Sequence, residues 1–103
     1  MKNSYDNFFV NFANKTRFNI IMALEERPLN VSEISKNLKE EQSKISHNLK
    51  KLTACHILEV KQKGKQRIYS LNKKTVVPML KIVGEHVRNN CLIKNCPKKC
   101  END

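Results

Sequence analysis

The sequence lacks tryptophan, and only 6% of its residues are aromatic. A hydrophobic core must therefore be built mainly from aliphatic side chains with a few phenylalanines. Only two glycines and three prolines are present, which excludes a collagen-like or low-complexity chain and favours helices. Acidic residues number half as many as basic ones, 10 against 20. This excess of positive charge predicts a polyanionic partner, with nucleic acid favoured over an anionic membrane.

Long hydrophobic runs are also missing. No window approaches the roughly 18 apolar residues of a membrane-spanning helix, and the N-terminal stretch does not resemble a signal peptide. We therefore expect a single cytoplasmic domain with no membrane partner, whose cysteines are reduced thiols or metal ligands. The sequence has no glycine-rich phosphate loop, no paired carboxylates in an apolar setting and no Ser/His/Asp arrangement, so we expect no enzymatic activity.

Hydrophobic residues recur at helical spacing in four consecutive segments. Pro28 closes the second segment because proline cannot continue a helix. Ser32 with Glu33 is expected to open a short third helix, and the fourth helix is expected to begin near Gln42. The apolar helix faces are Tyr5, Phe8, Phe9 and Phe12; Phe18, Ile21, Met22 and Leu24; Ile34 and Leu38; and Ile45, Leu49 and Leu52, and the last two sets are expected to point inward. The first helix could pack in the core or form a dimer.

The hydrophobic period changes after residue 57. Two segments of strand character flank "KQKGKQR", in which Gly64 is the turn residue, and together they predict a β-hairpin. A last helix carries a heptad stripe of valines and leucine. The expected fold is mainly α with a β-hairpin (α+β), a winged helix-turn-helix in the order helix, helix, helix, helix, strand, strand, helix. Residues 1–90 would form this domain, and residues 91–103 a cysteine-rich C-terminal tail.

The fourth helix and the hairpin carry the residues expected to bind DNA. The second helix of a helix-turn-helix enters the major groove, and short polar side chains at its start reach base edges. A basic hairpin beside the groove would contact phosphates or the minor groove. Residues 36–74 hold eleven basic and three acidic residues, so this segment carries +8 of the total charge of +10. The candidate DNA-binding residues are Gln42, Ser43, Lys44, Ser46, His47, Lys50, Lys51, Lys63, Lys65 and Arg67.

These segments resemble the ArsR/SmtB family of winged-helix repressors. "NKTRFNIIMAL" resembles the family's opening D-P-T-R-L-x-I-L-x-x-L. "QSKISHNLKKLTACHILEVKQKGKQRIYSLN" resembles S-x-V-S-x-H-L-x-x-L-x-x-A-G-L-V-x-x-x-R-x-G-R-x-x-x-Y-x-L. The resemblance runs from about Asn14 to Asn72 and extends loosely into the terminal helices.

The resemblance implies a homodimer formed by the first and last helices, and binding to double-stranded DNA that is relieved when a metal ion or an oxidant acts on cysteines. In this chain the terminal helices carry the stripes Phe8/Phe12 and Val76/Leu80/Val83/Val87. Asn48 stands where the family often has histidine, a difference expected to alter base preference. His56 stands at the usual glycine, and histidine tolerates a left-handed backbone better than most residues. The family's familiar cysteine pair in the third helix is absent.

Three of the four cysteines lie in the tail "CLIKNCPKKC". Zinc or another thiophilic metal prefers thiolates, and zinc takes four ligands. Cys91, Cys96 and Cys100 supply three, and Cys55 could be the fourth unless it is a packed core thiol; a water molecule, His56 or His86 are the alternatives. Nearby Lys94, Lys98 and Lys99 favour the reactive thiolate form, so a redox switch that closes a disulfide in the tail is a rival.

Two functions are compatible with these patterns. The first is a sequence-specific DNA-binding transcriptional regulator, a repressor that responds to a thiophilic metal or to redox state. The second is a winged-helix interaction module that binds RNA or an acidic protein, with a structural zinc in the tail. Sequence alone does not name the operator, the metal or the sign of the response.

Overall fold

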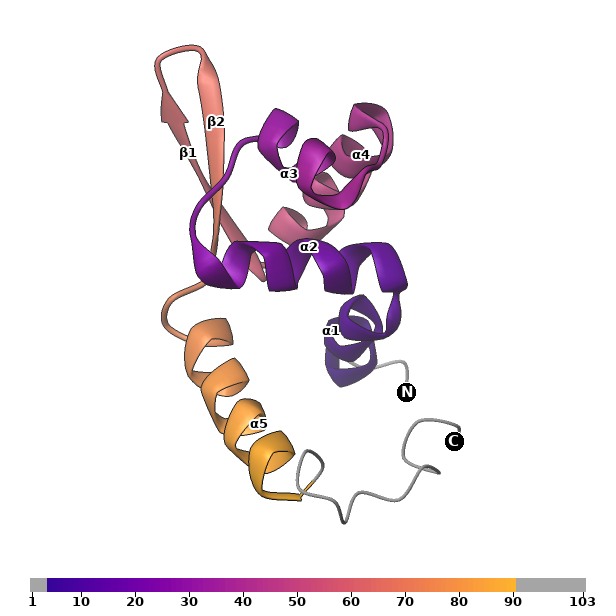
Figure 1. The fold of residues 1–103 in the computed structure, drawn as a ribbon, viewed down its shortest axis with the longest axis vertical. Helices are drawn as coiled ribbons and strands as arrows, with labels where there is room; N and C mark the ends of the chain where they lie inside the picture. Colours follow the sequence, from indigo (N-terminus) through magenta and orange to yellow (C-terminus); the bar gives the residue numbers. More distant parts are fainter. Residues whose placement is uncertain (1–3, 91–103) are drawn as a thin grey trace. The chain divides into compact units, whose positions relative to one another are not determined.

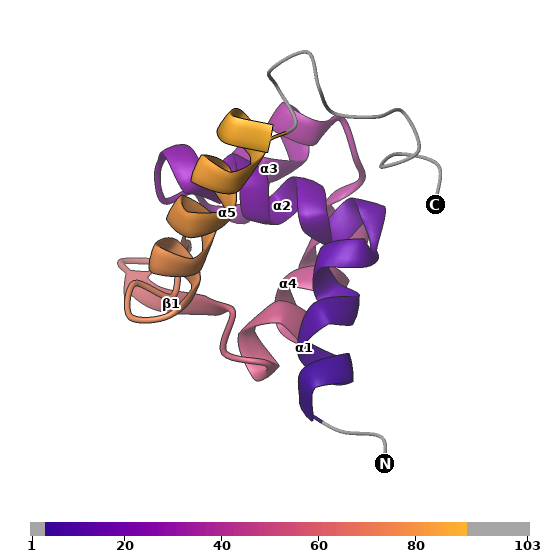
Figure 2. The same cartoon turned by 90° about the horizontal axis from the view of Figure 1, so that it is seen from below.

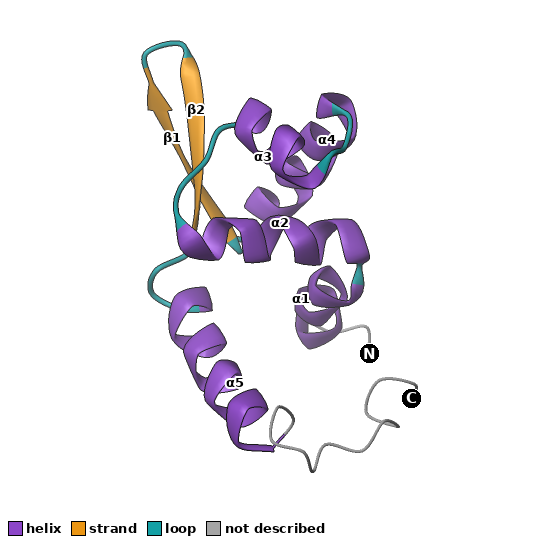
Figure 3. Cartoon of the chain, viewed as in Figure 1, coloured by secondary structure: helices purple, strands orange, loops and turns teal. Residues whose placement is uncertain are grey.

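The computed structural model describes residues 4–90 of the chain. Its elements follow the predicted order, with five helices and one antiparallel hairpin, and the winged helix-turn-helix prediction is confirmed (Figures 1 and 3). The elements are α1 (Ser4–Ala13), α2 (Lys15–Glu26), α3 (Val31–Leu38), α4 (Gln42–Ala54), β1 (Leu58–Lys63), β2 (Gln66–Leu71) and α5 (Val76–Asn90).

The described residues divide into two compact units, with the boundary between Asn72 and Lys73. In the first unit, α2 packs against α1, α3, α4 and β2, so it is the central helix of this part (Figures 1 and 2). The buried hydrophobic side chains of this unit are almost all aliphatic, as expected for a sequence without tryptophan. They are Ile20, Ile21 and Leu24 from α2, Ile34 from α3, Ile45, Leu49 and Leu52 from α4, and Leu29, Ile57, Leu58, Tyr69 and Leu71 from the loops and the hairpin.

The short helix α3 begins at a capping box formed by Asn30 and Glu33. The Asn30 side chain accepts a hydrogen bond of 2.8 Å from the Glu33 backbone N–H, and the Glu33 carboxylate accepts one of 2.9 Å from the Asn30 backbone N–H. These bonds satisfy backbone donors that have no partner within a helix's first turn. The prediction that Ser32 opens this helix is therefore wrong, because Ser32 already lies inside it.

The hairpin β1–β2, hereafter the wing, has a regular antiparallel register from Leu58↔Leu71 at its base to Lys63↔Gln66 at its tip. Gly64 has φ +62° at the first of the two turn residues, where glycine suits the type II′ turns of two-residue hairpins. Leu29, just before α3, pairs with Tyr69 through two backbone hydrogen bonds of 3.1 and 2.8 Å. The chain that enters α3 thus extends the base of the wing by one bridge.

Helix α5 belongs to the second unit. Val76 at its start is 1% exposed, whereas Ile82 and Val83 are 68% and 47% exposed. Its apolar residues are therefore unequally exposed along the helix. None of the helices within residues 4–90 has the length and apolar character that a membrane span requires.

Candidate DNA-binding face

An open groove separates α4 from the wing. Four predicted DNA-binding residues of α4 and one of β2 line this groove, together with the apolar side chains Val31, Val60 and Tyr69. Polar and basic groups therefore line the groove together with apolar side chains, a combination that the sequence patterns did not anticipate. The predicted residues in the groove are Ser43, Ser46, His47, Lys50 and Arg67.

Local sequence explains why these α4 side chains face outward. Ile45, Leu49 and Leu52 recur at helical spacing and are fully buried, so α4 is fixed along this face. Between them, Ser46, His47, Lys50 and Lys51 are exposed, whereas Asn48 is buried. The amphipathic pattern thus turns the polar face of α4 toward the groove.

Two predicted residues of α4 already have partners within the protein. The side-chain amide of Gln42 donates a hydrogen bond of 3.1 Å to the Ser32 hydroxyl. Lys44 forms an ion pair of 3.2 Å with Glu40, one helical turn away. Both side chains of that pair are partly exposed, and such surface pairs contribute little to stability, so Lys44 is free to exchange Glu40 for a phosphate.

The remaining candidates are distributed along α4 and the wing. Lys51 is exposed but does not line the groove. Lys63 and Lys65 flank Gly64 at the exposed tip of the wing. Lys65 and Arg67 also line a second, polar groove beside the start of α3, so Arg67 borders both grooves. The structure thus places the predicted residues on α4 and the wing; their roles in DNA binding stay a prediction.

Asn48 corrects one expectation drawn from the family resemblance. It is 9% exposed, and its side-chain amide donates a hydrogen bond of 2.9 Å to the backbone carbonyl of Lys44. A buried amide satisfied within its own helix does not reach a base edge. Any effect of Asn48 on base preference must therefore be indirect.

Two residues that bear on this face, Asn30 and Gln66, were not among the predicted set. They line the second groove and are joined by a hydrogen bond of 3.0 Å between their side chains. The spacing of Asn30 and Glu33 is a capping-box signal that identifies Asn30 as a helix start. No sequence signal pairs Asn30 with a residue 36 positions away.

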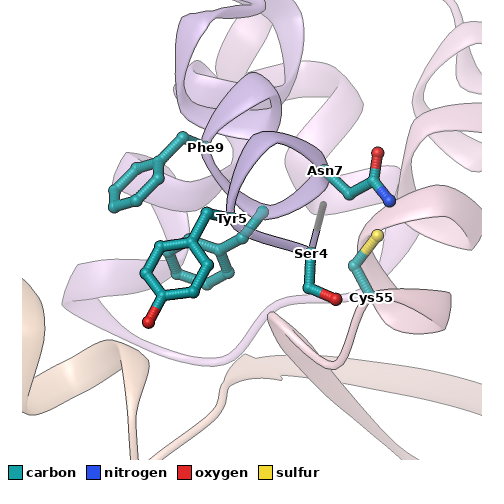
Figure 4. A pocket seen from close by; sticks show the side chains of 6 residues that line it. Ser4, Tyr5, Asn7, Phe9 and Cys55 are labelled. Atoms are coloured by element: carbon teal, nitrogen blue, oxygen red, sulfur yellow. The ribbon is translucent and has the colours of Figure 1, made fainter. Parts of the chain in front are cut away.

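Cys55 follows α4 and is an exposed free thiol, so the alternative of a packed core thiol is wrong. Its side chain lies near Ser4 and Asn7 of α1 and lines a pocket with them and with Tyr5 and Phe9 of the same helix (Figure 4). Within residues 4–90, no three His, Cys, Asp or Glu side chains cluster to hold a metal ion. Cys91, Cys96 and Cys100 lie outside the described residues.

A helix-turn-helix whose second helix borders a groove beside a basic hairpin defines a winged helix-turn-helix DNA-binding protein. Residues 14–60 match the family model described as "Bacterial regulatory protein, arsR family". The helix-turn-helix segment and the first strand of this chain are therefore similar to the ArsR family of bacterial regulatory proteins.

Solved structures share this fold. HlyU from Vibrio cholerae N16961 is 24% identical with a TM-score of 0.71, and the match covers 85% of this chain and 92% of HlyU. The homodimeric winged helix-turn-helix DNA-binding domain of Mb0332 from Mycobacterium bovis is 20% identical with a TM-score of 0.74, covering 85% of each chain. The transcriptional repressor PagR of Bacillus anthracis is 27% identical with a TM-score of 0.67, covering 78% of this chain and 92% of PagR. A search of curated protein sequences finds no match.

Proposed function

We propose that this protein is a sequence-specific repressor that binds an operator as a homodimer and responds, through its cysteines, to a thiophilic metal ion or to redox state. The groove between α4 and the wing is the observation that carries the DNA-binding part. Its serines and histidine suit base edges, and Lys50 and Arg67 suit phosphates. Repression is supported by the similarity to PagR, which is a transcriptional repressor.

Dimer formation is supported by exposed apolar residues on α1 and, separately, on α5. Tyr5, Phe9 and Val10 of α1 are 76%, 56% and 52% exposed, and Ile82 and Val83 of α5 are also exposed. Large apolar side chains in such clusters mark contact surfaces more often than solvated ones. On α1 the most exposed of these are Tyr5 and Phe9, whereas Phe8 and Phe12 are half-buried. The similarity to the homodimeric domain of Mb0332 supports the same assembly.

Sensing rests on the chemistry of the cysteines. Cys55 offers one exposed thiol at the end of α4, the helix that would read the operator. The tail cysteines Cys91, Cys96 and Cys100 would supply the other thiolates of a zinc-like site, or the thiols of a redox pair. A ligand that joins Cys55 to the tail would shift the DNA affinity only by binding one conformation of the regulator better than the other.

Binding-site selection from random duplex DNA, followed by a salt titration, tests the DNA-binding part. We expect a palindromic site and an affinity that falls steeply with salt, since each neutralised phosphate releases condensed counterions. Weak binding that is indifferent to sequence would favour the alternative, an interaction module for RNA or an acidic protein with a structural zinc in its tail. A stable monomer with no duplex affinity at low salt would overturn the proposal.

A further inference from the structure

The first turn of α3 is hydrogen-bonded through side chains to both elements of the DNA-binding face. Asn30 donates its side-chain amide to the Gln66 side chain of the wing at 3.0 Å. Ser32 accepts a hydrogen bond of 3.1 Å from Gln42 at the start of α4. The wing and α4 are therefore both connected to one turn of one short helix.

The capping box fixes the direction of the Asn30 amide. The side-chain oxygen of Asn30 is occupied by the backbone N–H of Glu33, and the Asn30 backbone N–H is occupied by the Glu33 carboxylate. Only the side-chain N–H₂ group then remains to bond elsewhere, and Gln66 accepts from it. The contact to the wing is thus made by a side chain whose orientation is already set.

The outer half of the wing has little else to hold it. At its base, Leu58, Tyr69 and Leu71 are buried, and Leu29 pairs with Tyr69. In contrast, every residue of β1 from 59 to 63 is exposed, as are residues 64–67 at the tip. A two-stranded hairpin without a packed face is marginally stable in water. Gln66 directly follows the turn residues. Its hydrogen bond to Asn30 therefore lies in the part of the wing where no buried side chains hold the strands in place.

The basic residues of the wing depend on this outer half for their position. Lys63, Lys65 and Arg67 all lie within three residues of Gln66. Lys65 and Arg67 line the same groove as Asn30 and Gln66, and Arg67 also borders the groove beside α4. The direction of the wing tip therefore decides whether these cations and α4 meet the same DNA duplex.

We infer that Asn30 is a positioning residue for DNA binding, and that its hydrogen bond to Gln66 holds the wing tip in register with α4. This inference rests on the proposed function. Asn30 itself need not touch DNA; it acts through Gln66 on the neighbouring wing cations.

Asn30→Ser and Gln66→Ala, alone and together in the full-length protein, test the inference. Serine keeps a capping oxygen of comparable quality but cannot bridge to Gln66, so α3 should start normally. Affinity for the selected duplex and its salt dependence would be measured by fluorescence anisotropy. Each single change should weaken binding about threefold to tenfold, as expected for one lost hydrogen bond. The slope of log affinity against log salt should also become shallower, by about one if one phosphate contact is lost.

The double variant distinguishes positioning from other roles. If both residues act through one bond, the double variant should bind DNA no more weakly than either single variant. Additive losses of affinity would mean that Gln66 or Asn30 contacts DNA independently. Unchanged affinity in the single variants would mean that the bond does not position the wing, and either result overturns the inference. A urea unfolding curve of Asn30→Ser that matches the unchanged protein confirms an intact cap.

Amide relaxation in the DNA-free protein supplies a second readout. Backbone ¹⁵N order parameters of residues 63–67 should fall in both single variants, whereas those of α4 should not. Unchanged order parameters overturn the inference even if affinity falls. A wild-type protein without duplex affinity overturns the proposed function first, and the variants then have no binding to modulate. Wild-type binding with unaffected variants overturns only the role of Asn30.

Discussion

The side-chain amide of Asn72 donates a hydrogen bond of 2.8 Å to the backbone carbonyl of His56. His56 has φ +62° and follows Cys55, the C-cap of α4; its backbone N–H donates to Thr53 and that of Ile57 donates to Leu52, both at 3.0 Å. The backbone bonds form a Schellman-type helix end, in which a left-handed residue lets the last carbonyls find partners. Asn72, which follows β2, therefore ties the end of the wing to the end of the helix expected to read DNA.

Replacing His56 by glycine should stabilise the protein. A left-handed backbone costs a residue with a Cβ about 1–2 kcal/mol, and glycine removes this cost. Because glycine also has a larger conformational entropy in the unfolded state, we expect the free energy of unfolding to rise by only roughly 0.5–1 kcal/mol. The His56 side chain is exposed and contributes little packing. Urea unfolding at fixed protein concentration measures the change. A loss of stability would show that the imidazole makes a contact worth more than the backbone strain.

Asn11→Ala should destabilise the protein. Asn11 is 1% exposed, accepts a hydrogen bond of 3.0 Å from the Arg17 guanidinium and donates to the backbone carbonyls of Asn7 and Phe8. Within the described residues, the Arg17 Nε is already buried without a partner, so removing Asn11 would take the partner from a second nitrogen of the same guanidinium. We expect the free energy of unfolding to fall by about 1–3 kcal/mol. Thermal or urea unfolding measures this loss.

Asn7→Ala is the matched control, because Asn7 is an exposed asparagine on the same helix. Its backbone carbonyl, which the substitution keeps, is the group that accepts the hydrogen bond from Asn11. A surface change of this kind should stay within about 0.5 kcal/mol. Equal effects of the two substitutions would mean that the α1 helix itself, and not the Asn11–Arg17 contact, sets the loss.

The order of elements and most of the core were predictable because they depend on local periodicity. The burial of Ile45, Leu49 and Leu52 follows from their spacing alone, and Gly64 marks the hairpin turn. Periodicity and turn signals of this kind need only neighbouring residues to be recognised. The left-handed His56 was anticipated in another way, from the family resemblance, because it stands at the family's usual glycine.

Features that depend on distant parts of the chain were not predictable. Asn48 lies on the same helix as Ser46 and His47, and only the packing of that helix shows that its amide faces inward. Gln42 has the chemistry of a base-reading residue, yet its amide is bonded to Ser32 ten positions away. Polar side chains of one type can bind DNA or form hydrogen bonds within the protein. Residue identity could therefore predict which face of α4 is polar, but not the partner of each side chain.

Lys63→Ala and Arg67→Ala should weaken binding to all DNA sequences alike. Both residues lie on the exposed wing, where a cation meets phosphates that carry no sequence information. Each lost phosphate contact should make the salt slope shallower by about 0.9. Salt titrations on selected and unrelated duplexes measure both effects. The control is Lys15→Ala, which removes the same charge from the start of α2. An equal loss of affinity in this variant would mean that net charge, and not the position of the wing cations, determines DNA binding.

Ser46→Ala should impair recognition of particular bases. Ser46 is exposed in the groove between α4 and the wing, where its hydroxyl can bond a base edge. We expect a loss of about 1–3 kcal/mol on the selected site, concentrated at one or two base pairs. Binding to a panel of single-base variants of the site locates the loss. A uniform reduction across the panel would contradict a base contact, and an unchanged melting temperature excludes misfolding.

The tail cysteines should be required for the response but not for DNA binding. Cys96→Ser combined with Cys100→Ser should leave operator affinity unchanged, because neither residue is part of α4 or the wing. The same double variant should abolish the change in affinity caused by a thiophilic metal or an oxidant.

Metal content and free thiols of the anaerobically purified protein separate the two mechanisms. A stoichiometric metal supports coordination, and free thiols that form a disulfide on oxidation support a redox switch. Cys55→Ser is the comparison, since its exposed thiol ends α4. If Cys55→Ser also abolishes a metal response, Cys55 shares the site with the tail; if the Cys96/Cys100 variant still responds, the sensing proposal is wrong.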